Sequence, residues 1–151
     1  MSAETDFTLT PKQKRLVRES FEVAHEYSNS LTKLFYGRLF ELEPSTRSLF
    51  KRSLDEQSRK LFEMLTTVVG ALDRFEELRP QLADLGRKHV TYGATPAHYD
   101  VVRVALLWAL AQALEQDFNR DTKAAWDQML RAVTAAMVDT TVPLDSSRTV
   151  R

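Results

Sequence analysis

The chain contains no cysteine among its 151 residues. This absence excludes disulfide bonds, cysteine-held zinc or iron–sulfur centres, and a thiol nucleophile. Glycine is also scarce, and the four glycines stand too far apart to form a loop that cradles phosphate groups. No apolar run approaches the roughly 18 residues that cross a bilayer, and residues 1–9 are too acidic and polar for a signal peptide. We therefore expect a cytoplasmic protein that does not enter a membrane.

No excess of one charge is present either, because 21 Lys and Arg residues balance 21 Asp and Glu residues. Proteins that bind the phosphate backbone of nucleic acids are usually clearly basic, so nucleic-acid binding is not expected. The length suits one compact domain, and a hydrophobic content of 43% is sufficient for a sizeable core.

The five prolines are expected only at the edges of helices. Thr10 precedes Pro11 and Thr95 precedes Pro96, which places a capping hydroxyl before a proline at the first helical position. Ser53 begins a further capping signal without proline. Apolar residues recur at helical spacing between these signals. The sequence predicts an all-α protein with helices near 11–27, 29–42, 44–50, 54–72, 76–91, 96–116 and 120–140.

Three side chains interrupt otherwise apolar helix faces. His89 follows three leucines at helical spacing and is expected to point at the core, either as a histidine bonded to a backbone carbonyl or as a single metal ligand. A single protein ligand suffices only for a metal that brings its other ligands, as haem iron does. Gln57 is either a boundary residue that faces solvent or a residue that lines a pocket. Tyr36 is either a core residue with its hydroxyl at the rim or a hydrogen-bond donor in a pocket. His25 and His98 are expected at the surface without a role.

Five motifs together resemble the globins, over about residues 10 to 140. They are Leu34–Phe40 in the second helix, Pro44 followed six residues later by Phe50, Gln57 four residues before Leu61, His89 32 residues after Gln57, and Tyr99 ten residues after His89. Residues 57–61, 84–89 and 92–93 are similar to single-domain bacterial globins of the flavohaemoglobin-like type, such as the Hell's Gate globins. The resemblance implies a globin fold, a three-on-three helical sandwich of about seven helices.

The resemblance also implies haem b as the cofactor. His89 would be the proximal ligand of the iron, Phe50 would pack on the porphyrin, and Tyr36 and Gln57 would face a bound ligand. Lys60, Lys88 and Arg87 are candidates for the haem propionates. The full set of expected cofactor-binding residues is Tyr36, Phe50, Gln57, Lys60, Leu61, Leu85, Lys88, His89, Tyr92 and Tyr99.

On this resemblance we expect reversible binding of O2, and of CO and NO, at the haem iron. O2 on ferrous iron gains negative charge, which the donors Tyr36 and Gln57 would stabilise. An alternative is nitric oxide dioxygenase activity with a separate reductase, because no reductase domain is expected in this chain. A gas sensor with an output domain and a haem-free interaction module are weaker alternatives.

The expected organisation is an N-terminal extension (1–9), a globin domain (10–140) and a flexible C-terminal tail (141–151). One departure from the flavohaemoglobins is expected near the end of the chain. Alignment on Trp126 places their proximal glutamate at Pro143, so the arrangement of histidine, tyrosine and glutamate looks incomplete.

Overall fold

The computed structural model describes residues 9–50 and 53–139, and every regular element within these residues is a helix. The α-helices are α1 (Pro11–Glu26), α2 (Ser28–Leu42), α3 (Leu54–Gly70), α4 (Phe75–Thr91), α5 (Pro96–Leu114) and α6 (Arg120–Met137). The short 3₁₀-helices are η2 (Pro44–Leu49), η3 (Leu72–Arg74) and η4 (Glu115–Asp117). The predicted all-α class is confirmed. The predicted N-terminal extension up to residue 8, the tail 141–151 and Pro143 lie outside the described residues.

The predicted helix starts agree with the observed caps. Thr10 accepts a hydrogen bond from the backbone N–H of Gln13 at 3.1 Å, and the Gln13 side chain accepts one from the Thr10 N–H at 3.0 Å. Ser53 accepts from the backbone of Glu56 at 3.2 Å. These bonds satisfy N–H groups that have no partner inside the helix, which explains why the helices begin at these residues.

Pro80 corrects the expectation that proline stands only at helix edges. It lies inside α4, where its ring removes a backbone donor. The helix nevertheless continues, because Leu78 and Leu82 on either side of it are buried in the core. Tertiary packing outweighs the local cost of the proline.

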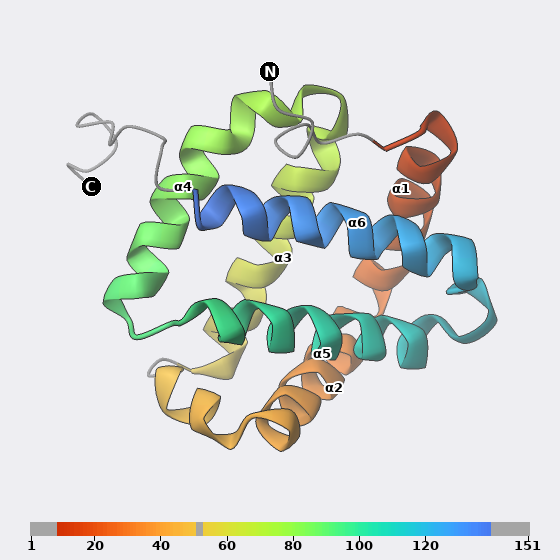
Figure 1. The fold of residues 1–151 in the computed structure, drawn as a ribbon. Coiled ribbons are helices and arrows are strands. Elements are labelled where there is room, and N and C mark those ends of the chain that lie inside the picture. Colours follow the sequence, from red (N-terminus) through yellow and green to blue (C-terminus); the bar gives the residue numbers. More distant parts are fainter. Residues whose placement is uncertain (1–8, 51–52, 140–151) are drawn as a thin grey trace.

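The six α-helices form two layers, as Figure 1 shows. Helix α5 packs against α2 and α6 in one layer, while α1 packs against α3 in the other. Helices α1 and α4 cross α6 and join the layers. This is the three-on-three sandwich of the globin fold, and the almost uniformly apolar α5 is buried against α1, α2 and α6, as its sequence predicted.

Two close contacts fix the helices around the core. The indole Nε1 of Trp126, which is fully buried, donates a hydrogen bond to the Ser20 hydroxyl at 2.8 Å and joins α6 to α1. Gly86 lies where α4 crosses α6, and a Cβ atom at this position would overlap the main chain of Met137. The absence of a side chain at residue 86 therefore lets α4 lie close to α6.

Candidate functional site

Helices α3 and α4 diverge from the corner at η3 that joins them (Figure 1). The first turn of α3, which carries Gln57, and the last turn of α4, which carries His89, therefore both lie at the end away from this corner. Helix α3 packs mainly on α1, and α4 packs mainly on α6. Because α3 and α4 pack mainly on other helices, they do not cover each other's side chains at this end.

The imidazole of His89 has one nitrogen fixed and one free. Its Nδ1 lies 2.8 Å from the carbonyl oxygen of Leu85, one turn earlier in α4. A carbonyl only accepts hydrogen bonds, so Nδ1 carries a proton, and in the neutral imidazole Nε2 then retains a lone pair. Within the described residues Nε2 has no hydrogen-bond partner. This is the tautomer that a metal-ligating histidine needs.

His89 is half-buried, and its turn lies at the end of α4, where Val90 is 66% exposed and Tyr92 is 65% exposed. The described part of the chain contains no group of three or more His, Cys, Asp or Glu residues that could hold a metal ion. A haem iron needs only one such side chain, because the porphyrin supplies most of its ligands.

Tyr99 lies beside His89, with the ring centroids 6.2 Å apart and the planes inclined by 34°. Its hydroxyl is buried and has no hydrogen-bond partner in the described residues, and burial raises its pKa. Buried polar atoms nearly always have a hydrogen-bond partner. The unpartnered hydroxyl of Tyr99 therefore indicates a site at which the protein chain alone does not supply this partner.

Tyr36 on α2 is a buried donor within a group of aromatic rings. Only 5% of the residue is exposed, and Phe50 meets its ring edge-on at a centroid distance of 5.3 Å. Phe40 lies 6.0 Å from the same ring. Burial raises the pKa of Tyr36 to about 12, although a hydrogen bond with Ser58 acts in the opposite direction. The hydroxyl is therefore protonated at neutral pH and can donate a hydrogen bond.

Gln57 and Leu61 are half-buried on α3, one turn apart. The backbone N–H of Gln57 bonds to the Ser53 carbonyl at 3.1 Å, whereas its side-chain amide has no partner in the described residues. The amide is thus available as a donor, and Leu61 packs beside the core as an apolar neighbour.

The other predicted site residues are less enclosed. Leu85 is half-buried beside the core, while Lys60, Lys88 and Tyr92 are exposed. Neither lysine forms an ion pair with a described residue. Arg87 differs, because it donates to Asp84 at 2.6 Å and is already engaged. Lys60 and Lys88 are consequently the better candidates for binding an anionic group.

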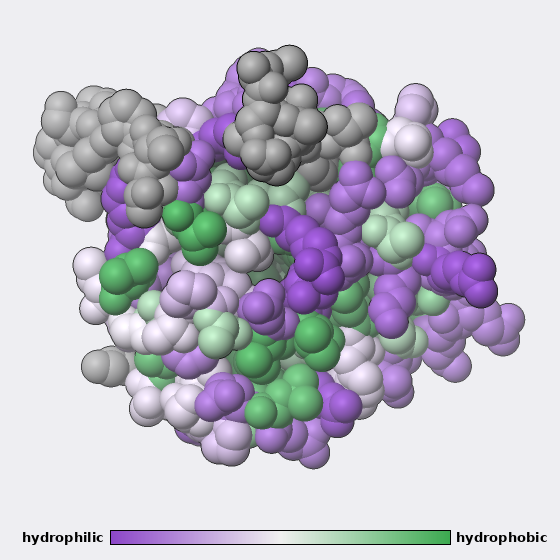
Figure 2. Space-filling model, viewed as in Figure 1, coloured by the Kyte–Doolittle hydropathy of each residue, from purple (hydrophilic) through white to green (hydrophobic). Residues whose placement is uncertain are grey.

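Hydrophobic side chains do not form one broad patch on the visible face. Figure 2 shows that most of this face is hydrophilic and that hydrophobic surface gathers over α5 and α2. Among the described residues, the large exposed apolar side chains are few and scattered. Isolated exposed apolar residues are normal in soluble folds and do not mark a binding surface.

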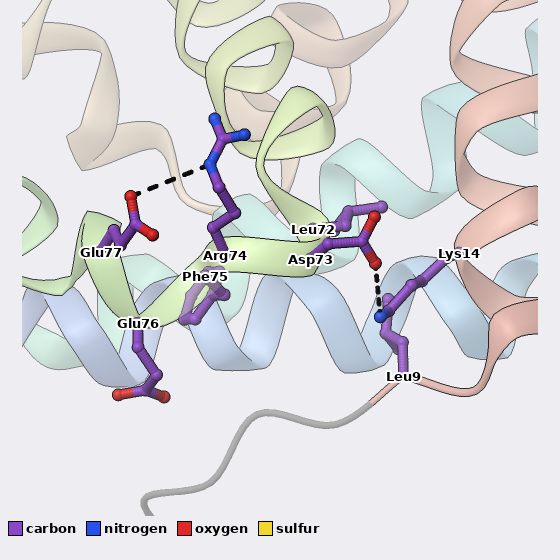
Figure 3. Close-up of a pocket in the computed structure, with 8 residues that line it drawn as sticks. All are labelled: Leu9, Lys14, Leu72, Asp73, Arg74, Phe75, Glu76 and Glu77. Atoms are coloured by element: carbon purple, nitrogen blue, oxygen red, sulfur yellow. Dashed lines mark hydrogen bonds and ion pairs between the residues drawn. The ribbon is translucent and has the colours of Figure 1, made fainter.

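Two further hollows lie away from His89. A cleft of about 1100 Å³ opens between α2 and α3, and Tyr36 and Ser58 line it together with polar and charged side chains. A smaller hollow of about 370 Å³ lies at the η3 corner (Figure 3). There Asp73 meets Lys14 at 2.7 Å and Arg18 at 3.1 Å. These ion pairs hold the corner against α1, so we assign the smaller hollow a structural role.

The structure also shows contacts of residues to which the sequence analysis assigned no role. His98 is part of a helix cap, since its Nδ1 accepts a hydrogen bond from the backbone N–H of Thr95 at 3.0 Å. His25 is exposed, as expected, and its ring stands edge-on to Phe62. Ser58 lines the same cleft as Tyr36, and only its place next to Gln57 could have drawn attention to it.

Comparisons with known proteins point to one family. The globin family model matches residues 33–137. Flavohemoprotein B of Dictyostelium discoideum is 26% identical over 132 residues, which cover 87% of this chain but only 31% of that protein. Neuroglobin-1 of Oncorhynchus mykiss is 29% identical over 85% of this chain and 90% of its own. Anaerobic nitrite reductase AHB2 of Arabidopsis thaliana is 30% identical over 79% and 85%.

A solved structure is similar in fold. It is an engineered carbene transferase from Rhodothermus marinus, which superimposes with a TM-score of 0.76 at 24% sequence identity and covers 95% of this chain and 98% of its own. This likeness concerns the arrangement of helices. No helix among the described residues is long and apolar enough to cross a membrane.

Proposed function

The chain belongs to the globin family, and we propose that it binds haem b through His89 and carries small gaseous ligands at the haem iron. The observation that carries this proposal is the His89 ring, whose Nδ1 is fixed by the Leu85 carbonyl and whose Nε2 is free. The absence of any cluster of metal ligands in the described residues supports it, because haem needs only this one side chain.

Several of the predicted site residues have side chains that would suit a haem group. Leu61 and Leu85 would line its apolar faces, and Phe50 would pack against it. Tyr99, whose buried hydroxyl lacks a protein partner, would lie on the same side as His89. Lys60, Lys88 and Tyr92 would lie at its exposed edge, where the unpaired lysines suit the carboxylates of the propionates.

When bound, haem would supply an iron atom that takes O2, CO or NO as a ligand. Tyr36 and Gln57 would act on the opposite side from His89, and each side chain can donate a hydrogen bond. A hydrogen bond to an acceptor with charge contributes about 1.5–3 kcal/mol, and each 1.4 kcal/mol changes an affinity about tenfold. O2, which gathers negative charge, should therefore gain more affinity from these bonds than CO, which gathers little.

Absorption spectra would test this proposal. The protein expressed with haem available should give a Soret band and a reduced form that binds CO and O2. His89→Ala should lose or grossly alter this spectrum, while His25→Ala, a change at an exposed histidine, should leave it intact. A wild-type chain without a Soret band after haem reconstitution would contradict the proposal.

A second candidate function is the conversion of NO to nitrate with bound O2. It is favoured by the similarity to flavohemoproteins, of which this chain spans about a third, and each turnover would need electrons from a reductase. Nitrate production should then continue through many turnovers when a reductase is supplied. Reduction too slow to sustain turnover would favour O2 binding alone.

A further inference from the structure

Among the described residues that line the cleft between α2 and α3, Tyr36 alone belongs to the predicted site. The cleft stays open because α2 packs mainly on α5 and α3 packs mainly on α1. Phe50 and Gln57 do not line it. Phe50 nevertheless meets the Tyr36 ring edge-on, at a centroid distance of 5.3 Å. The Tyr36 ring therefore has the cleft on one side and Phe50 on another.

The inner surface of this cleft suits a small, uncharged molecule. Its buried lining residues are Thr32, Tyr36 and Phe62, each 8% exposed or less. The Thr32 hydroxyl donates to the Ser28 carbonyl at 2.9 Å, so its proton is already engaged. O2, CO and NO carry no net charge and need no polar partner to pass such a surface. The charged lining residues are all exposed, and they are Lys33, Arg47, Asp55, Arg59 and Glu63.

Gly37 leaves the cleft open beside Tyr36. It is exposed, it lines the cleft, and nothing lies within 4 Å of a Cβ atom built on it. Because Gly37 directly follows Tyr36 in α2, this open space adjoins the buried phenol. A large side chain at residue 37 can therefore occupy the cleft without displacing the core.

We propose that this cleft is the route by which O2, CO or NO reaches the site, and that the Tyr36 ring is the barrier at its inner end. Only 5% of Tyr36 is exposed, so passage requires the ring to move aside for a short time. Phe40 and Phe50 limit this movement, because their centroids lie 6.0 and 5.3 Å from that of the ring. This inference rests on the proposed function, because it concerns the path of the ligand to the haem iron.

A route differs from a ligand contact in its effect on kinetics. A blocked route raises a barrier that the ligand crosses both on entering and on leaving. The association and dissociation rates therefore fall by the same factor, and the dissociation constant, which is their ratio, does not change. Loss of a hydrogen bond to the bound ligand instead raises the dissociation rate and weakens the affinity. Kinetic measurements can thus separate the two roles of Tyr36.

Substitution of Gly37 tests the route in the haem-loaded chain. Gly37→Trp should lower the CO association rate, measured by flash photolysis, and the CO dissociation rate, measured by displacement with NO. Both rates should fall by about an order of magnitude, with the affinity unchanged. Gly37→Leu, which adds a smaller side chain, should lower both rates by a smaller factor and keeps the test available if Gly37→Trp does not fold.

Gly70→Trp is the matched control for Gly37→Trp. Gly70 is also exposed, with nothing within 4 Å of a built Cβ atom, but it does not line the cleft. This variant should keep both wild-type rates. Unchanged rates in folded Gly37→Trp and Gly37→Leu would overturn the route. A weaker affinity with an unchanged association rate would also overturn it.

A second readout does not need haem. Dissolved O2 is paramagnetic and speeds the nuclear relaxation of the groups that it reaches. In selectively labelled full-length protein, the effect of O2 on the Tyr36 ring should be smaller in Gly37→Trp than in wild type and unchanged in Gly70→Trp. Tyr27, which is 51% exposed, should respond equally in all three proteins and serves as a reference. An equal effect on Tyr36 in all three would overturn the route, whereas a missing Soret band would contradict the proposed function.

Discussion

At the scale of single residues, the physical state of Tyr36 follows from its burial. Removal of the phenol from water penalises its charged form and raises the pKa to about 12. At neutral pH the side chain is therefore a hydrogen-bond donor. His89 is a donor at Nδ1 and an acceptor at Nε2, because the Leu85 carbonyl selects its tautomer. In both side chains the protein sets which atoms donate and which accept hydrogen bonds before any ligand binds.

Tyr36→Phe should raise the O2 dissociation rate by about an order of magnitude, since it removes one donor to a charged acceptor. Stopped-flow mixing of the O2 complex with CO would measure this rate. Tyr27→Phe is a suitable control because Tyr27 is 51% exposed at the junction of α1 and α2. An unchanged rate in Tyr36→Phe would contradict a role for the phenol proton.

At the scale of elements, the approach of α4 to α6 depends on one glycine. Gly86→Ala would place a methyl group on the main chain of Met137, and the two helices would have to separate. We expect a loss of about 1–3 kcal/mol in the free energy of unfolding, as for other overpacked sites. Urea titration followed by circular dichroism would measure it.

Gly37→Ala is the matched control for that substitution. Gly37 is an exposed glycine inside α2, with nothing within 4 Å of a built Cβ atom. Alanine favours a helix interior over glycine, so this variant should be stabilised by about 0.5–1 kcal/mol. Equal stability of Gly86→Ala and wild type would contradict the close approach of α4 and α6.

At the scale of the whole molecule, charged side chains join distant helices. Asp73 connects the η3 corner to α1, and hydrogen bonds from Lys14 and Arg18 lower its pKa. Burial would raise the pKa of Asp127, but its hydrogen bonds with Arg131 and Arg103 outweigh burial and lower it. A carboxylate whose pKa is lower in the folded state stabilises the fold above its unfolded pKa. That contribution is lost as the pH falls through the folded value.

The acid dependence of stability should therefore change when these carboxylates are removed. Asp73→Asn and Asp127→Asn should lower the melting temperature at pH 7, and their difference from wild type should shrink toward pH 3. Asp117→Asn provides a control, because Asp117 is exposed in η4 and has no ion pair with a described residue. A difference that stays constant with pH would contradict the assigned ion pairs. Melting curves recorded by circular dichroism at each pH would decide.

Haem binding should also stabilise the whole fold. A ligand present at about a thousand times its dissociation constant adds about 4 kcal/mol to the native state, which corresponds to an increase of about 10 °C in melting temperature for a chain of this size. Differential scanning calorimetry with and without haem would measure the increase, and His89→Ala should lose most of it. An equal increase in that variant would contradict ligation by His89.

The sequence by itself determined the elements of this protein, because capping residues and helical periodicity act over a few neighbouring positions. The capping box of Thr10 and Gln13 is an example, and it formed as predicted. The capping signal at Ser53 placed the start of α3, and the apolar pattern showed that α5 would be buried on several sides. Pro80 was misjudged because its neighbours Leu78 and Leu82 gain more from burial than the proline loses.

Only the tertiary structure decided how the site residues meet. The half-buried state of His89, the unpartnered hydroxyl of Tyr99 and the burial of Tyr36 beside Phe50 all depend on segments that are far apart in the chain. Local rules contain no information on such contacts, because burial is set by the relative placement of whole helices. The family resemblance indicated which residues to consider, and the packing of α2, α3 and α4 gave them their surroundings.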